Sequence, residues 1–289
     1  MRKITAILLL VCLLLCGCAP KQQGNIVTPV QEQLWVHFID VGQADCTLLE
    51  YNGHFALVDG GNDGDGEAVA AYLQLQGVQK LDLVVATHPH EDHIGGLSTV
   101  IDMIPVDTVW SSPIPNSTNP TRNFLKSVAK RDKEVEQPQV GQVFNLGDAT
   151  ITVIGPVKEY DELNNLSIVL MVQHGDNRFL LTGDMERTAE NDLIDSGADL
   201  KADVLKVGHH GSETSTGYRF LREVMPTYGI ISCGKDNSYG HPHEDPLSRL
   251  RDAEVTVLRT DECSTIVARS DGKDIYLLWG EEHIFPNAA

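Results

Sequence analysis

Apolar residues recur along this chain with two periods, which divide it into strands and helices. Short apolar or alternating runs between turn residues predict strands at 34–41, 46–51, 54–58, 81–86, 106–110, 142–146, 150–154, 167–173, 178–182, 203–207, 229–233 and 256–259, and a final hairpin at 264–278. Helical spacing predicts helices at 67–75, 96–103, 122–131, 188–196, 216–223 and 246–252. Strands twice give way to strand–helix alternation, so we expect two mixed sheets packed together with helices outside.

The first 18 residues have the pattern of a targeting segment. Arg2 and Lys3 precede an apolar run at 7–15, which is short for a membrane span, and Gly17 and Cys18 follow. The segment resembles a bacterial lipoprotein signal, which would make Cys18 the lipidated first residue of an extracytoplasmic protein held at the cell membrane. An uncleaved anchor and plain secretion are the alternatives. We expect a polar tether at 19–32 and one folded domain at 33–284.

Composition narrows the possible functions. The chain has 289 residues, enough for one large α/β domain, and a net charge of −19. This charge argues against a nucleic-acid-binding protein, although a local basic strip could still dock phosphates. Beyond the leader only Cys46, Cys233 and Cys263 remain, so a disulfide scaffold is not expected and a single bridge stays open.

Residues 87–96 carry the strongest chemical signal in the chain. Three imidazoles and two carboxylates occur within six residues directly after a predicted strand, and His88, His90, Asp92 and His93 are the candidate ligands. Neutral imidazole and carboxylate are ligands that Zn²⁺ and similar ions prefer. Alternation would turn the first two residues to one point and the last two to another, so one or two ions are expected. The alternative is a solvated loop with chance histidines.

Other polar residues follow predicted strands in the same way. Asp59 comes after 55–58 and Asp184 after 180–183, where its carboxylate could bridge two cations. His209 and His210 come after 204–207; one could bind metal while the other supports it or protonates a leaving group. His241 is either a residue that contacts the substrate or an ordinary loop histidine.

In this order, these motifs resemble the metallo-β-lactamase superfamily, and more narrowly the metal-hydrolase domain of ComEC-type competence proteins. The residues that carry the resemblance are 38–45, 57–61, 87–96, 164–170, 180–184, 203–212, 231–234 and 239–242. The resemblance covers nearly all of residues 34–280. It implies an αββα sandwich with metals at one edge of the sheets and a metal-activated water as nucleophile.

The resemblance also implies a set of ligands. A first metal position would use His88, His90 and Asp184; a second would use Asp92, His93, Asp184 and one of His209 and His210, for which we choose His209. Most of the superfamily supplies a further histidine where Asn164 and Asn165 stand here, so the first position should bind less tightly, favouring Mn²⁺ or a single ion. Asp59 and Asn165 are expected to support the ligands from behind.

The sequence therefore predicts a lipid-anchored extracytoplasmic hydrolase that depends on Zn²⁺ or Mn²⁺ and cleaves phosphodiesters, with DNA as one candidate substrate. Asp92 would share the role of base, and His210 or His241 would stabilise the leaving oxygen. The alternatives are another phosphodiester such as a choline phosphate ester, a β-lactam or cyclic ester, or a non-catalytic metal-binding surface lipoprotein. No obligate protein partner is evident.

Overall fold

The computed structural model describes residues 32–115 and 117–280. The predicted leader, Cys18 and nearly all of the tether lie outside these residues, as do the last positions of the predicted domain. Within the described residues, no helix combines the length and the apolar character needed to cross a bilayer.

The first sheet has eight strands, of which four run parallel. Its spatial order is β15 (Ile275–Trp279), β14 (Ile266–Ser270), β1 (Leu34–Phe38), β2 (Thr47–Tyr51), β3 (His54–Val58), β4 (Leu81–Ala86), β5 (Val106–Ser111) and β6 (Val135–Glu136). Neighbours are antiparallel from β15 to β3 and parallel from β3 to β6. The parallel part delivers the ends of β3 and β4 to the same edge.

The second sheet has seven strands and repeats this division. Its order is β13 (Thr256–Arg259), β12 (Tyr228–Ile231), β11 (Val204–Lys206), β10 (Asn177–Leu181), β9 (Val169–His174), β8 (Ala149–Gly155) and β7 (Val143–Leu146). Neighbours are antiparallel from β7 to β10 and parallel from β10 to β13. The ends of β10 and β11 therefore also meet at one edge.

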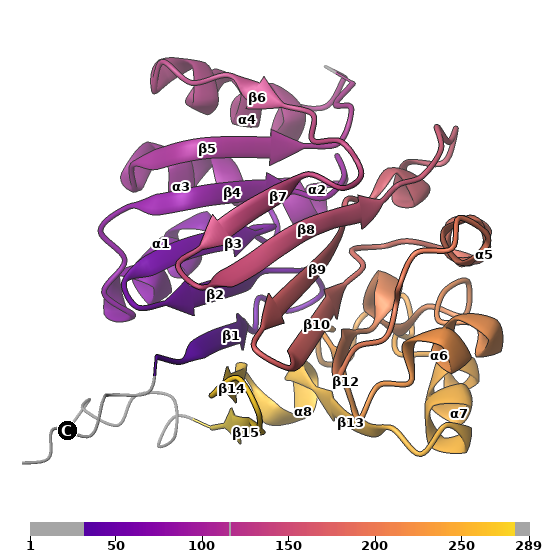
Figure 1. Ribbon diagram of the computed structural model, residues 1–289. Coiled ribbons are helices and arrows are strands. Elements are labelled where there is room, and N and C mark those ends of the chain that lie inside the picture. The colour runs from indigo at the N-terminus through magenta and orange to yellow at the C-terminus, as the bar shows by residue number, and fades with distance from the viewer. Residues whose placement is uncertain (1–31, 116, 281–289) are drawn as a thin grey trace, which may run out of the picture. The chain divides into compact units, whose positions relative to one another are not determined.

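Helices cover the outer faces of both sheets (Figure 1). They are α1 (Gly66–Leu75), α3 (Leu97–Met103), α4 (Asn119–Lys130), α5 (Arg187–Asp195), α6 (Tyr218–Val224) and α7 (Glu244–Asp252). Two four-residue helices, α2 (Glu91–Ile94) and α8 (Thr260–Cys263), follow β4 and β13. One buried cluster joins the sheets through residues such as Val85 and Phe179. A second lies between the first sheet and α1, α3 and α4, and a third between the second sheet and α5, α6 and α7. The predicted αββα sandwich is confirmed.

The structure differs from the predicted elements mainly at short segments. β6, α2 and α8 were not predicted, nor were the 3₁₀ turns Leu163–Leu166 and Gly208–Gly211, because two to four residues are too few to show a period. Helix α4 begins inside the predicted loop 111–121. Thr118 caps it by accepting a hydrogen bond from the Thr121 amide, and Pro120 occupies the first turn.

Three glycines let the loop after β3 pack against the segment that follows β4. A Cβ atom on Gly96 would lie 2.0 Å from the Gly60 carbonyl oxygen, and one on Gly95 would lie 2.3 Å from the Asp63 amide nitrogen. The Gly60 amide also donates to the His93 carbonyl oxygen at 2.8 Å. This close backbone contact places Asp59 beside the histidine-rich loop.

Substitution of Gly96 by alanine should therefore destabilise the fold. The added methyl group would meet the backbone of Gly60, which cannot move aside as a flexible side chain could. We therefore expect a loss of about 1–3 kcal/mol in the free energy of unfolding, measured from urea denaturation midpoints. Gly64→Ala is the matched control, since its Cβ would meet no atom within 4 Å. Equal midpoints for the two variants would contradict this packing.

Candidate metal centre

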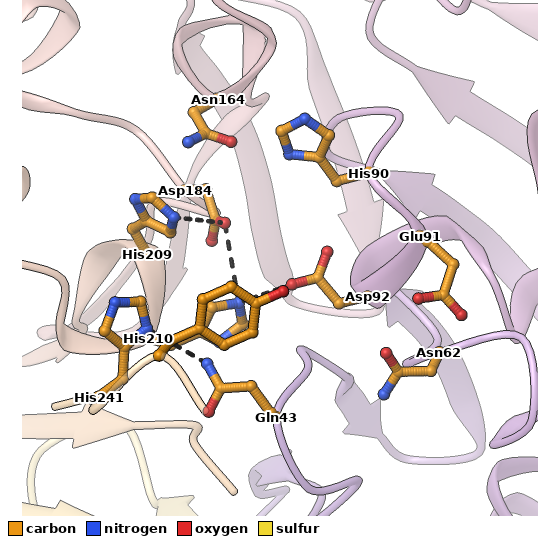
Figure 2. A pocket seen from close by; sticks show the side chains of 11 residues that line it. Gln43, Asn62, His90, Glu91, Asp92, Asn164, Asp184, His209, His210 and His241 are labelled. Carbon is orange, nitrogen blue, oxygen red and sulfur yellow. Dashed lines mark hydrogen bonds and ion pairs between the residues drawn. The ribbon is translucent and has the colours of Figure 1, made fainter. Parts of the chain in front are cut away.

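The loops after β3, β4, β10 and β11 converge on one pocket at the strand ends. The cavity has a volume of about 500 Å³. Figure 2 shows side chains from both halves of the chain pointing into it. The residues that line it are Gln43, Asn62, His90, Glu91, Asp92, Asn164, Asp184, His209, His210, Tyr239 and His241.

Four side chains form a compact cluster at the floor of this pocket: Asp92, His93, Asp184 and His210. Each offers one ligand atom, and these atoms all lie within 4.8 Å of one another. His93 Nε2 is 3.2 Å from Asp184 Oδ1, and His210 Nε2 is 3.3 Å from Asp92 Oδ2 and 3.7 Å from Asp184 Oδ2. Imidazole nitrogen and carboxylate oxygen at these separations make a suitable donor set for a divalent cation.

The hydrogen-bonding state of the cluster supports this assignment. His93 Nε2, Asp184 Oδ1 and His210 Nε2 are buried and have no hydrogen-bond partner among the described residues. Because buried polar atoms are almost always paired, three such atoms facing one another indicate a shared ligand. The residues present therefore fit a metal ion.

The electrostatics of the cluster point the same way. Burial lowers the pKa of His210, but the carboxylates of Asp184 and Asp45 outweigh it and raise that pKa to about 10. Burial also opposes charge on His93, yet Asp184 and Asp59 hold its pKa well above the usual value. Conversely, His93 and His210 hold the pKa of Asp184 well below its usual range despite burial. The carboxylates attract cationic charge, which protons on the imidazoles supply when no metal is bound.

The structure brings the predicted first position, His88 and His90 with Asp184, to the same pocket. His88 Nε2 lies 3.0 Å from His90 Nδ1 and 3.8 Å from Asp184 Oδ2. The group of ligand atoms within 4.8 Å of one another does not include these two histidines. A second ion bound by His88 and His90 is therefore a proposal, and its support is the distance from His88 to Asp184.

Of the paired histidines, the geometry favours His210 as the ligand, whereas we chose His209 from the sequence. His210 is buried and its Nδ1 lies 2.9 Å from the Ser232 carbonyl oxygen, so Nδ1 carries the proton and Nε2 faces the cluster. His209 is partly exposed, and its Nδ1 lies 3.2 Å from Thr214 Oγ1 and 3.4 Å from Glu186 Oε1. Its Nε2 is 3.8 Å from Asp184 Oδ2, nearly the same distance as for His210, but the compact group of ligand atoms includes only His210. His210 is thus the better candidate ligand, and His209 lines the pocket beside it.

Asp59 and the asparagine pair show how the ligands are supported. Asp59 Oδ2 accepts from His93 Nδ1 at 2.8 Å, which directs Nε2 of that ring into the cluster. Asn165 Oδ1 instead accepts from the Glu186 amide and holds the loop after β10. The neighbouring Asn164 lines the pocket and donates to Glu186 Oε1, so it is the asparagine that a substrate or ion would meet.

A buried ion pair behind His210 was not predicted. Lys206 Nζ donates to Asp45 Oδ2 at 2.7 Å, and the side chains of these residues are only 2% and 6% exposed. The other oxygen of Asp45 lies 3.3 Å from His210 Nδ1. The pair joins the loop after β1 to the end of β11 and places a carboxylate directly behind a candidate ligand. Lys206 was missed because it lies within the apolar run 204–207, which predicts only a buried strand.

Metal binding should release protons. His93 and His210 are protonated at pH 7 because their pKa values are raised, whereas a ligating imidazole must be neutral. Zn²⁺ binding should then release about two protons, and affinity should rise as pH rises toward 10 and fall in acid. Calorimetry in two buffers of different ionisation enthalpy measures the number. The His210→Gln variant should release about one proton fewer on binding Zn²⁺. Binding heats that are the same in both buffers would contradict the assignment of these histidines as ligands.

Paired replacements can separate the positioning role of Asp45 from its structural role. Lys206→Met alone leaves a buried carboxylate uncompensated and should lower the free energy of unfolding by about 3–5 kcal/mol. The double variant Asp45→Leu/Lys206→Met should recover most of that stability, yet bind Zn²⁺ about 10-fold more weakly because the carboxylate behind His210 is gone. Recovery of both stability and affinity in the double variant would show that the pair is only structural.

Comparisons with known proteins agree with the fold. The family model of the metallo-beta-lactamase superfamily matches residues 39–235. The chain is 34% identical over 199 residues to ComE operon protein 3 of Bacillus subtilis, covering 68% of this chain and 26% of that protein. It is 30% identical over 225 residues to competence protein ComA of Neisseria gonorrhoeae, covering 77% and 30%. The chain thus spans less than a third of the length of these relatives.

A solved structure supports the fold alone. The metallo-beta-lactamase fold protein YhfI of Bacillus subtilis superposes with a TM-score of 0.57 at 14% identity, covering 83% of this chain and all of that one. The family match, which extends over more than half of the chain, shows that the chain belongs to the metallo-β-lactamase superfamily, and the identity to both competence proteins agrees with a domain of the ComEC type.

Proposed function

We propose that this domain is a metal-dependent phosphodiesterase. The main support is the cluster of Asp92, His93, Asp184 and His210, in which three ligand atoms without hydrogen-bond partners among the described residues face one another at the floor of the pocket. The relationship to competence proteins makes DNA one candidate substrate, and the net charge of −19 opposes a long polyanion. From the pattern of residues 1–18 we also propose a lipid-anchored, extracytoplasmic location.

The cluster would hold the metal, with His88 and His90 available to a second ion. A bound divalent metal supplies a water that is nucleophilic near neutral pH and offsets charge on the scissile group. Asp92 would orient this water. Its carboxylate is partly exposed to the pocket, and although burial raises its pKa, His93 and His210 lower it to about 2, so it stays ionised and accepts hydrogen bonds.

His241 is placed to stabilise the leaving oxygen, and a neighbouring amide fixes its tautomer. Gln43 Oε1 accepts from the Gly234 amide at 3.0 Å, which turns Gln43 Nε2 toward His241 Nδ1 at 3.3 Å. An amide nitrogen donates, so Nδ1 must be the unprotonated nitrogen. Burial and the nearby His210 and His209 lower the pKa of His241 to about 4, so the neutral ring carries its proton on Nε2. That N–H is available to a leaving group.

Hydrolysis of bis(p-nitrophenyl) phosphate tests the proposal directly. The protein stripped by a chelator should be inactive, and Mn²⁺ or Zn²⁺ should restore turnover. Asp184→Asn should lower both metal content and rate, by more than the roughly 10–100-fold typical of residues behind ligands. Asp176→Asn, an exposed change elsewhere, is the control. Bound metal without turnover would favour a non-catalytic metal-binding protein. Turnover without nicking of DNA would exclude only the nuclease.

A further inference from the structure

The pocket wall opposite the histidine-rich loop is formed by a fixed loop, residues 234–243. Asn237 Oδ1 accepts from the amides of Tyr239 and His241, at 3.1 and 3.0 Å. The amide nitrogen of the same side chain donates to the carbonyl oxygens of Gly234 and His241, at 2.9 and 2.6 Å. One side chain therefore satisfies four backbone groups of the loop and sets the direction of the residues it carries.

This loop presents an aromatic surface to the pocket. The Tyr239 ring stacks on His241, with centroids 5.6 Å apart and planes inclined by 24°, and His241 stacks in turn over His210. Tyr239 lines the pocket but is 66% exposed, so most of its ring is uncovered. No step proposed for the metal cluster uses this ring. An ordered, uncovered aromatic face beside a reaction site is suited to stacking against a planar group.

The charges of the pocket limit what else it can recognise. Among the described residues, none of the eleven side chains that line it is lysine or arginine, and three are carboxylates. Lys206 lies deeper and is already paired with Asp45. A polynucleotide groove needs cationic side chains along successive phosphates. This pocket offers such charge only where a metal would bind, and so at a single phosphate.

We propose that Tyr239, which stacks on His241, forms a platform on which a planar group attached to the scissile phosphodiester stacks. The site would then recognise a single diester unit. This inference rests on the proposed function and names its substrate class: a phosphodiester with one adjoining aromatic or nucleobase group. A free small diester and a nucleotide within single-stranded DNA share this chemistry.

Two diesters with the same leaving group test the platform. Methyl p-nitrophenyl phosphate lacks the second planar group of bis(p-nitrophenyl) phosphate. The wild-type protein should show a KM about 10-fold lower for the bis-aryl ester. Tyr239→Leu should remove this difference with little change in kcat, and Tyr239→Phe should keep it. Tyr218→Leu, an exposed tyrosine outside the pocket, is the control. An unchanged KM ratio in Tyr239→Leu would overturn the proposal.

A binding measurement decides the matter even if no ester is hydrolysed, which would defeat the proposed function alone. The Zn²⁺-loaded protein should bind thymidine 5′-monophosphate about 10-fold more tightly than inorganic phosphate by calorimetry. Tyr239→Leu should bind the two equally, while Tyr239→Phe should retain the preference. Equal affinities in the wild-type protein would overturn the platform.

The dependence of KM on substrate length and on salt concentration distinguishes a free small diester from a nucleotide within single-stranded DNA. If the site recognises one diester unit, a thymidine dinucleotide and an oligothymidylate of about 20 nucleotides should have similar KM values. A plot of log KM against log salt concentration should then have a slope of magnitude about 0.7 or less. A KM that falls steeply with chain length, together with a slope of several units, would show tracking along a polynucleotide and contradict recognition of a single unit.

Discussion

Four buried or half-buried carboxylates, Asp45, Asp59, Asp92 and Asp184, converge at one edge of the sandwich, and their charge must be compensated. Lys206 neutralises the first, and His93 and His210 carry protons opposite the others. Buried anions are tolerated only with such partners. The same requirement makes the edge a cation site: a divalent metal can replace the two protons and satisfy ligand atoms that lack hydrogen bonds. The rest of the fold holds these groups together.

The two halves of the chain contribute different functions to this edge. The first half supplies the histidine-rich loop and Asp59, and glycine-to-glycine backbone packing fixes their distance. The second half supplies Asp184 and His210, together with the wall that carries His241. Gln43 crosses from the first half to this wall and determines which nitrogen of His241 holds the proton. The pocket thus has a face suited to a metal and an opposite face suited to a leaving oxygen and to a second, planar group of the diester.

Periodicity and spacing predicted much of this arrangement. The αββα sandwich followed from alternating elements and family motifs, and β3, β4 and β13 have the predicted boundaries. The choice between His209 and His210 could not be predicted. Both have positive φ, 50° and 52°, and the Ser232 carbonyl, 22 residues away from His210, decides which ring turns inward. The Asp45–Lys206 pair spans 161 residues, and no local pattern reveals such a contact.

Asp92, His93, Asp184 and His210 should together bind one divalent cation. Anomalous diffraction from crystals grown with Zn²⁺ and collected on both sides of the zinc absorption edge tests it most directly. We expect an anomalous peak within bonding distance, about 2.0–2.2 Å, of His93 Nε2, His210 Nε2 and an Asp184 oxygen. A peak bound by His209 in place of His210, or no peak at this cluster in protein that hydrolyses phosphodiesters, would contradict it.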